Sequence, residues 1–229
     1  MRAGTSTSGT RVPNHAVKYF QIDCIYAQGA GHALAIGVFL GERGKAAGAE
    51  GRMEPPPDAS MTSSTPDAAR SYAIEMHGDQ KYGTRPYAHH LDAVVALLQP
   101  YGEKAQVVGY LHDVVEDTDA TVSDVQSRFG DLVARCVALL TDAPGANRKE
   151  RKAKTYAALS RVNGDEELAL VVKAADRLAN VRACVADGHL ALWETYRGEH
   201  PTFRAAAFRE GQCDPLWSEL DQLLQGVAG

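Results

Sequence analysis

The sequence of 229 residues is poor in cysteine, and its four cysteines form no Cys-x-x-Cys pair. Cys24, Cys136, Cys184 and Cys213 stand far apart along the chain. This spacing argues against a structural zinc knuckle and against a disulfide framework. We therefore expect the protein to work in a reducing, cytoplasmic environment.

Long apolar runs are also absent. The most apolar stretch, residues 33–40, is too short to span a bilayer. No charged and then apolar leader precedes a small-residue cleavage site. These features predict a soluble protein with no membrane partner.

The chain has no excess of positive charge. It contains 24 Lys and Arg against 29 Asp and Glu, giving a formal net charge of -5 and a pI of about 5.9. This balance argues against a nucleic-acid partner, although it still allows a local basic pocket for a phosphorylated small molecule. The sequence indicates no oligomeric state.

Strand signals are confined to the first 60 residues. Residues 19–26 alternate polar and apolar side chains, a Gly-rich turn follows, and residues 33–40 are apolar, so a short hairpin is expected. Residues 41–66 have the Gly, Pro, Ser and Thr content of a linker. We interpret residues 1–60 as a poorly ordered N-terminal extension and residues 61–229 as one domain.

From residue 67 onward, the spacing of apolar residues indicates helices. Thr121 and Asp124 predict a capping box. The expected helices cover 67–77, 87–98, 103–117, 125–129, 131–140, 148–160, 166–186, 189–196, 202–210 and 215–224. The fold class that follows is all-α, a globular helical bundle.

A cluster of chemically active side chains lies near the end of the expected helix over 103–117. On a continuous helix, His112 lies above Glu116 and Asp113 above Asp117, so an imidazole and three carboxylates form one patch. Acidic side chains near a helix C-terminus oppose the helix dipole. Side chains that oppose the local structure in this way indicate a functional role.

Two other segments supply the same kinds of ligand. Residues 87–90 end in His89-His90, and the apolar helix expected over 166–186 is interrupted by Asp176. A mixed set of imidazoles and carboxylates suits Mn²⁺, Fe²⁺ or Zn²⁺, and the lack of nearby thiolates argues against structural zinc. A metal held in this way can activate water against a phosphoryl group, which indicates hydrolysis of a phosphoester or a pyrophosphate.

Each of these residues also has a purely structural interpretation. Asp176 can be a core carboxylate paired with Lys173 or Arg177, and His89 and His90 can be a helix cap and a surface residue. The three segments in combination favour the functional interpretation.

Three motifs carry a resemblance to a known family. They are His77-Gly-Asp-Gln-Lys-Tyr-Gly-Thr-Arg-Pro-Tyr-Ala-His-His90, Leu111-His-Asp-Val-Val-Glu-Asp-Thr118 and Val172-Lys-Ala-Ala-Asp-Arg-Leu-Ala-Asn180. In order and spacing, over about residues 66–182, they resemble the HD-domain hydrolases of the RelA/SpoT type, in particular the small alarmone hydrolases similar to metazoan Mesh1. The resemblance implies an all-helical HD fold and Mn²⁺-dependent removal of the 3′-pyrophosphate from ppGpp or pppGpp, giving GDP or GTP.

The resemblance also implies roles for individual residues. The implied metal ligands are His90, His112, Asp113 and Asp176; the implied water-activating pair is Glu116 and Asp117; the implied substrate-binding residues are His77, Lys81, Tyr82, Arg85, Lys173 and Asn180. Of these, Asn180 matches an asparagine that contacts the nucleotide near its ribose.

The loop over 81–85 departs from the family pattern. It is one residue shorter and carries Lys81-Tyr82 where the family has a basic pair. We expect Lys81 and Arg85 to supply charge and Tyr82 to stack on a base. Leu91 stands where a proline usually follows the first ligand histidine.

The altered loop leaves other substrates open. An HD phosphohydrolase acting on a deoxynucleotide, a cyclic dinucleotide or the 2′-phosphate of NADPH is the second hypothesis, and a non-catalytic nucleotide sensor is the third. No segment long enough for a synthetase domain follows residue 182, so we expect no bifunctional enzyme.

Overall fold

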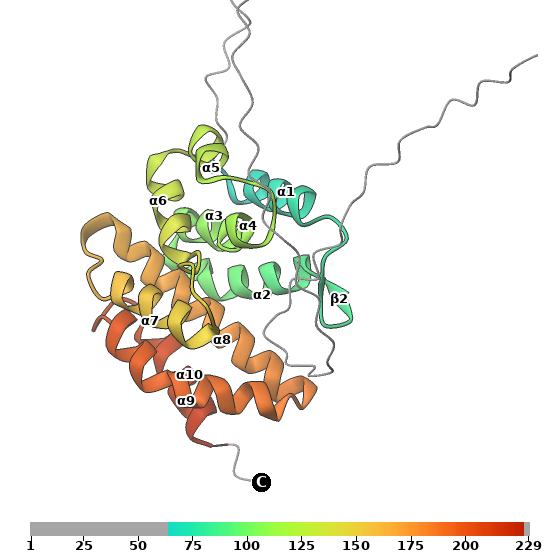
Figure 1. Cartoon of the computed structure of the whole chain (residues 1–229). Coiled ribbons are helices and arrows are strands. Elements are labelled where there is room, and N and C mark those ends of the chain that lie inside the picture. The colour runs from blue at the N-terminus through green and yellow to red at the C-terminus, as the bar shows by residue number, and fades with distance from the viewer. Residues whose placement is uncertain (1–63, 227–229) are drawn as a thin grey trace, which may run out of the picture.

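The computed structural model describes residues 64–226, so the hairpin expected within residues 19–40 and the expected domain boundary at residue 61 lie outside the described part. Figure 1 shows a bundle of helices with one short hairpin. The elements are α1 (Pro66–His77), β1 (Lys81–Tyr82), β2 (Arg85–Pro86), α2 (Ala88–Leu98), η1 (Gln99–Tyr101), α3 (Glu103–Leu111), α4 (Val114–Asp117), α5 (Val122–Phe129), α6 (Asp131–Leu140), α7 (Arg148–Leu159), η2 (Gly164–Glu167), α8 (Leu168–Asp187), α9 (Leu190–Ala207) and α10 (Asp214–Gln225). The expected all-α fold class is confirmed.

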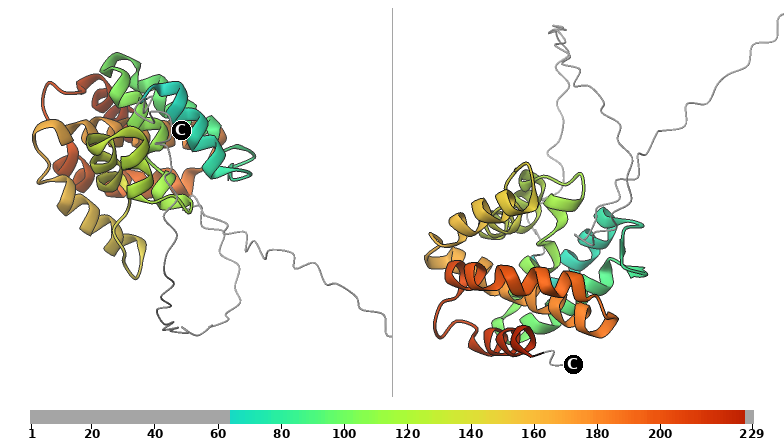
Figure 2. Two further views of the ribbon diagram at one scale, coloured as in Figure 1. Left: turned by 90° about the horizontal axis from the view of Figure 1, so that it is seen from above. Right: turned by 60° about the horizontal axis from the view of Figure 1, so that its bottom comes forward.

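Helix α8 is the centre of the bundle. It packs against α2, α3, α6, α9 and α10, and Figure 2 shows α9 running beside it. Of its 20 residues, 13 are buried, including Lys173, Asp176 and Arg177. A helix that is buried on most sides should be apolar throughout. The three buried charged residues are therefore exceptions that need partners inside the bundle.

Helices α2 and α3 approach each other closely at Gly109. A Cβ built on Gly109 would lie 2.5 Å from Cδ1 of Leu98 and 3.2 Å from Cγ2 of Val95, both on α2. Leu98 is fully buried, so it has little room to move aside. The absence of a side chain at Gly109 sets the distance between the two helices.

The prediction of a single helix over 103–117 is wrong, because the helix is interrupted between α3 and α4. His112 keeps helical dihedral angles, whereas Asp113 has φ -104° and ψ -5°, near the sparsely populated bridge region. Neighbouring side chains on a regular helix diverge by about 100°, and the break lets His112 and Asp113 converge. Helix α4 has only four residues, so the expected conflict with a long helix dipole does not arise.

Two further expectations fail at the ends of helices. The helices expected over 189–196 and 202–210 form one helix, α9, which runs through Pro201. Proline costs a hydrogen bond inside a helix, but Trp193, Tyr196 and Phe203 are buried on both sides of it and hold the helix to the core. Helix α5 begins at Val122, three residues earlier than expected, behind the capping box that was predicted.

The hairpin of β1 and β2 was not expected from the sequence. Its strands pair Lys81 with Pro86 and Tyr82 with Arg85, leaving Gly83 and Thr84 in the turn. Gly83 has φ 61° at the first turn position, where a type II′ turn favours glycine. The hairpin brings residues 81–86 beside the start of α2.

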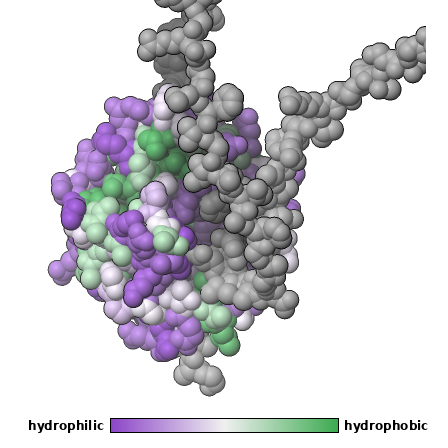
Figure 3. All heavy atoms as spheres, in the orientation of Figure 1, coloured by the Kyte–Doolittle hydropathy of each residue, from purple (hydrophilic) through white to green (hydrophobic). Residues whose placement is uncertain are grey.

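The described surface is mostly polar on the face that Figure 3 shows, with smaller apolar areas. Within residues 64–226, no helix combines the length and the hydropathy that crossing a membrane requires.

Candidate active site

Four donor atoms from three parts of the bundle converge. His90 comes from α2, His112 and Asp113 from the junction of α3 and α4, and Asp176 from α8. Nε2 of His90 lies 3.4 Å from Nε2 of His112, 3.8 Å from Oδ2 of Asp113 and 3.4 Å from Oδ1 of Asp176. Nε2 of His112 lies 2.9 Å from Oδ2 of Asp113 and 3.7 Å from Oδ1 of Asp176.

These separations fit a divalent ion. Donors about 2.1 Å from a metal are about 3.0 Å apart at 90° and about 3.4 Å apart at the tetrahedral angle. The five separations above, from 2.9 to 3.8 Å, lie around these values. Two imidazoles and two carboxylates suit Mn²⁺, Fe²⁺ or Zn²⁺. His90, His112 and Asp113, whose ligand atoms all lie within 4.8 Å of one another, can therefore hold a divalent metal ion, and Asp176 lies beside the two histidines.

The surrounding groups orient the donors toward such an ion. Nδ1 of His112 lies 2.7 Å from the carbonyl oxygen of Gly109 and donates to it, so Nε2 is the ring nitrogen that faces the other donors. Nδ2 of Asn180 donates to Oδ1 of Asp176 at 2.6 Å. Although burial of His112 opposes its charged form, Asp113 and Asp176 hold its pKa well above the usual range. The two carboxylates therefore stabilise a positive charge at the centre of the cluster.

The alternative interpretation of Asp176 as an ion-paired core residue holds for only one of its oxygens. Oδ2 lies 3.4 Å from Nζ of Lys173, while Oδ1 faces the two histidines. Arg177 pairs instead with Glu199, at 3.0 Å. Asp176 thus has an ion pair on one side and a ligand geometry on the other.

The two acids expected to activate water lie beside the donors. Oε2 of Glu116 accepts from the backbone N–H of Asp142 at 2.9 Å. Oδ2 of Asp117 accepts from Nε2 of Gln80 at 3.3 Å and lies 3.0 Å from the Tyr87 hydroxyl, which is closer to Oδ2 of Asp113, at 2.5 Å. Burial and the charge of Asp113 raise the pKa of Glu116, and burial, Asp113 and Glu116 raise the pKa of Asp117 to about 7. Asp117 can therefore exchange a proton near neutral pH.

A cleft of about 130 Å³ opens onto these groups. Besides His90, Asp113, Asp176 and the acid pair, it is lined by Tyr82, Tyr87, Asp142, Arg148, Arg151, Lys152, Lys173, Arg177, Asn180 and Tyr196. Five of the lining residues are lysines or arginines and five are aspartates or glutamates. A bound dication would leave this balanced lining with an excess of positive charge, which suits an anionic ligand.

Three basic residues of α7 line one part of the cleft, and we call them the basic wall: Arg148, Arg151 and Lys152. Each lies close to an acidic side chain. Nζ of Lys152 lies 2.8 Å from Asp142, and Nε of Arg148 lies 2.7 Å from Glu199. Burial of Asp142 and Glu199 disfavours their ionisation, but these cations outweigh it and hold the pKa of both carboxyls below the usual range. Burial and the charge of Lys173 lower the pKa of Lys152.

Three of the residues expected to bind substrate lie in the lining and three do not. Tyr82, Lys173 and Asn180 line the cleft. Lys81 and Arg85 are exposed on the hairpin, with Arg85 2.7 Å from Nε2 of His89. The buried His77 stacks on the Tyr87 ring at 4.2 Å, and its Nδ1 lies 2.8 Å from Oε1 of Gln80.

Several lining residues were missed from the sequence. They are Tyr87, Asp142, Arg148, Arg151, Lys152, Arg177 and Tyr196. The basic run over 148–154 was a usable signal, but on a helix it equally predicts a solvated face. Tyr87 was seen only as the start of a helix, and nothing local indicated its contacts with Asp113 and Asp117.

Comparison with known proteins identifies the family. The model of the HD domain family matches residues 69–195, which is more than half of the chain. A guanosine-3′,5′-bis(diphosphate) 3′-pyrophosphohydrolase of Aquifex aeolicus is 33% identical over 117 residues, covering 50% of this chain and 17% of that protein. The enzyme of that name from Danio rerio, MESH1, is 35% identical over 120 residues, covering 49% of this chain and 64% of its own. The matched part thus spans less than two thirds of the length of each of these relatives.

Two solved structures share the fold. One is of a metazoan SpoT ortholog that hydrolyzes ppGpp and plays a role in starvation responses; it aligns with a TM-score of 0.57 and 24% identity over 75% of this chain and 97% of its own. The other is a Listeria monocytogenes protein, with a TM-score of 0.51 and 27% identity over 61% of this chain and 94% of its own. With the donor set and the match over residues 69–195, the chain belongs to the HD domain family.

Proposed function

We propose that this chain hydrolyses the 3′-pyrophosphate of guanosine 3′,5′-bis(diphosphate) in a Mn²⁺-dependent reaction, giving GDP and pyrophosphate, or GTP from pppGpp. The observation that carries the proposal is the convergence of His90, His112, Asp113 and Asp176 at metal-ligand separations beside a pair of acids. The names of the curated relatives support guanosine bis(diphosphate) as the nucleotide.

The acid pair performs the proton chemistry. A Mn²⁺ ion held by the four donors would polarise a phosphoryl oxygen and lower the pKa of a coordinated water. Asp117 accepts the proton of the attacking water, and its pKa of about 7 suits that exchange at neutral pH. Glu116, fixed by the Asp142 backbone, holds the water in position. The water oxygen then bonds to the phosphorus next to the ribose 3′-oxygen, and the bond between that phosphorus and the 3′-oxygen breaks. The 3′-oxygen takes up the proton that Asp117 received, so GDP and pyrophosphate are released.

The basic wall of the cleft neutralises the remaining phosphates. Arg148, Arg151 and Lys152 project from one helix, α7, toward the cleft that the metal donors share. Arginine pairs with two phosphate oxygens at once, while lysine acts as a point charge. Asn180, which lines the cleft from α8, binds the ribose in this proposal.

Replacement of Asp113 by asparagine tests the reaction. Asp113→Asn removes an anionic donor from the metal site and should lower pyrophosphate release from ppGpp by about a hundredfold or more. The measurement is release of pyrophosphate from ppGpp at fixed Mn²⁺, with far-UV circular dichroism to show that the variant is folded. The matched control is Asp165→Asn, an exposed acid on η2, which should retain full activity.

A substrate panel separates this reaction from its alternatives. ppGpp, dGTP and NADPH are compared at one Mn²⁺ concentration, and ppGpp should be preferred. Faster turnover of dGTP or NADPH would show that this nucleotide, and not ppGpp, is the substrate. Binding of one of the three nucleotides by the metal-loaded protein, with no turnover of any of them, would instead favour a nucleotide sensor.

A further inference from the structure

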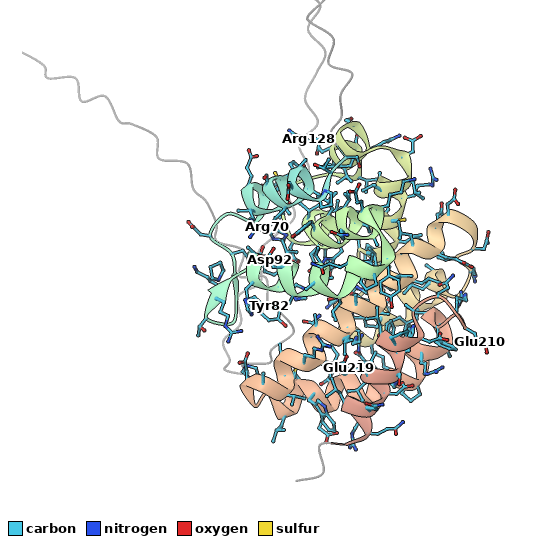
Figure 4. The ribbon with its side chains drawn as sticks, turned by 180° about the vertical axis from the view of Figure 1, so that it is seen from behind. Arg70, Tyr82, Asp92, Arg128, Glu210 and Glu219 are labelled. Carbon is cyan, nitrogen blue, oxygen red and sulfur yellow. The ribbon has the colours of Figure 1, made fainter. Side chains whose placement is uncertain are left out.

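Tyr82 connects the hairpin to two helices of the metal site. Its ring stacks on the ring of His90, with centroids 4.7 Å apart and planes inclined by 6°. Its hydroxyl donates to Oδ1 of Asn180 at 2.8 Å. Figure 4 labels Tyr82 on the hairpin beside α2. One side chain therefore contacts a metal ligand of α2 and a cleft residue of α8.

The contacts of Tyr82 continue to a second metal ligand. Asn180, which accepts from Tyr82, donates through Nδ2 to Oδ1 of Asp176 at 2.6 Å and to its backbone oxygen at 3.1 Å. The amide is thus oriented by both neighbours, with its oxygen toward the hairpin and its nitrogen toward the carboxylate. Because a carbonyl oxygen has two lone pairs, Oδ1 can also accept from a ribose hydroxyl while Tyr82 remains in place.

The stacked geometry adds to the expected role of the loop. The sequence predicts that Tyr82 stacks on the nucleobase, and in the structure one face of its ring lies on His90. The partly buried Tyr82 also makes an edge contact with Tyr87, at 6.3 Å and 73°. A ring packed on an imidazole and hydrogen-bonded at its far end is restricted in orientation.

We propose that Tyr82 is a positioning residue that fixes the imidazole of His90 for metal binding and the amide of Asn180 for the nucleotide. The ring and the hydroxyl have separable tasks. The ring limits rotation of the His90 side chain, so Nε2 stays directed at the other three donors. The hydroxyl holds Oδ1 of Asn180 at the wall of the cleft.

Two variants separate the tasks. Tyr82→Leu removes both contacts and should weaken Mn²⁺ binding by about tenfold, the lower end of the effect expected for groups that orient a metal ligand. Tyr82→Phe keeps the ring and should bind Mn²⁺ within about twofold of the parent chain. Binding of Mn²⁺ alone is measured from the electron paramagnetic resonance signal of the free ion, which needs no turnover. The matched control is Tyr101→Leu, a partly buried tyrosine on η1 outside the cleft lining, which should leave Mn²⁺ affinity unchanged.

The hydroxyl is tested in a second measurement, which rests on the proposed function. Tyr82→Phe should raise the KM for ppGpp about threefold or more with kcat nearly unchanged, because Asn180 loses its partner but the metal site is retained. An unchanged Mn²⁺ affinity in folded Tyr82→Leu would overturn the role of the ring, and an unchanged KM in Tyr82→Phe would overturn that of the hydroxyl. Weaker Mn²⁺ binding in Tyr82→Leu together with no ppGpp turnover by the parent chain would support the role of the ring and refute the proposed function.

Discussion

The carboxylates of the cleft are divided by their surroundings into two kinds. Asp113 and Asp176 face the imidazoles, and Lys173 also faces Asp176; these cationic partners outweigh the effect of burial and hold the pKa of both carboxyls below the usual range. Glu116 and Asp117 have fewer cationic partners, so burial and neighbouring charge raise their pKa. This divergence of pKa values within one site supports the proposed division between metal ligands and groups that transfer protons.

Gln80 should tune the pH at which the proposed enzyme becomes active. Its amide donates to Asp117, which favours the ionised carboxylate and opposes the rise of the pKa to about 7. The base must be ionised, so kcat/KM rises as pH increases through this pKa, and a bound Mn²⁺ that offsets the charge of Asp113 moves the rise to somewhat lower pH. Gln80→Leu removes the donor and should shift the rise to higher pH by about half a unit.

The measurement is the pH dependence of kcat/KM for ppGpp at saturating Mn²⁺. Gln126→Leu, an exposed glutamine on α5, serves as the control and should leave the profile in place. A profile of Gln80→Leu that is unmoved, or that moves to lower pH, would contradict the assignment of Asp117 as the proton acceptor.

At the scale of elements, the contact between α2 and α3 controls the distance between the two histidines. Gly109 lies where α3 meets Leu98 and Val95, and its carbonyl oxygen accepts from Nδ1 of His112. A wider separation of these helices would move His112 away from His90, which α2 carries. A single close approach therefore serves both packing and ligand geometry.

Gly109→Ala should destabilise the fold, although alanine is the better helix former. The added methyl group would overlap Leu98, and overpacking of a core costs about 1–3 kcal/mol, more than the gain in helix propensity of about 1 kcal/mol. Gly198→Ala is the matched control, because Gly198 is exposed within α9 and a Cβ there meets nothing within 4 Å. It should raise the free energy of unfolding by about 0.5–1 kcal/mol. Urea unfolding measures both, and a Gly109→Ala protein as stable as the Gly198→Ala protein would refute the packing argument.

Helices could be predicted from the sequence wherever the spacing of apolar residues within the segment itself determines the helix. The helices near α1, α2, α6 and α10 were expected within one or two residues of their observed bounds. The break at His112-Asp113 was not, because convergence of those side chains depends on His90 and Asp176, which are distant in the sequence. The predicted break before Thr202 was wrong for the same reason, because burial of Phe203 against the core keeps α9 intact through Pro201. The four candidate metal donors could be named because the three motifs resemble those of a known family, whereas the basic wall depends on how α7 packs.

At the scale of the whole molecule, the metal site lies where the core is least apolar. Lys173, Asp176 and Arg177 are buried in α8, and His90 and His112 are buried beside them. Buried charges are tolerated only when they are paired. Arg177 is paired with Glu199, while Asp113 and Asp176 share two imidazoles and Lys173. A dication at the four donors would complete this pairing and tie α2, α3 and α8 together.

Metal binding should therefore stabilise the entire fold. An ion that binds only the folded chain adds about 2.7 kcal/mol at one hundred times its dissociation constant. For a domain of this size, each kcal/mol raises Tm by about 2–4 °C, so Mn²⁺ should raise Tm by about 5–10 °C over the EDTA-treated protein. Asp176→Asn should abolish most of this shift, because it removes the only donor that α8 contributes among the four. Asp165→Asn should keep the full shift, since its side chain is exposed on η2 outside the cleft. An equal shift in both variants would mean that Mn²⁺ stabilises the protein from a different site.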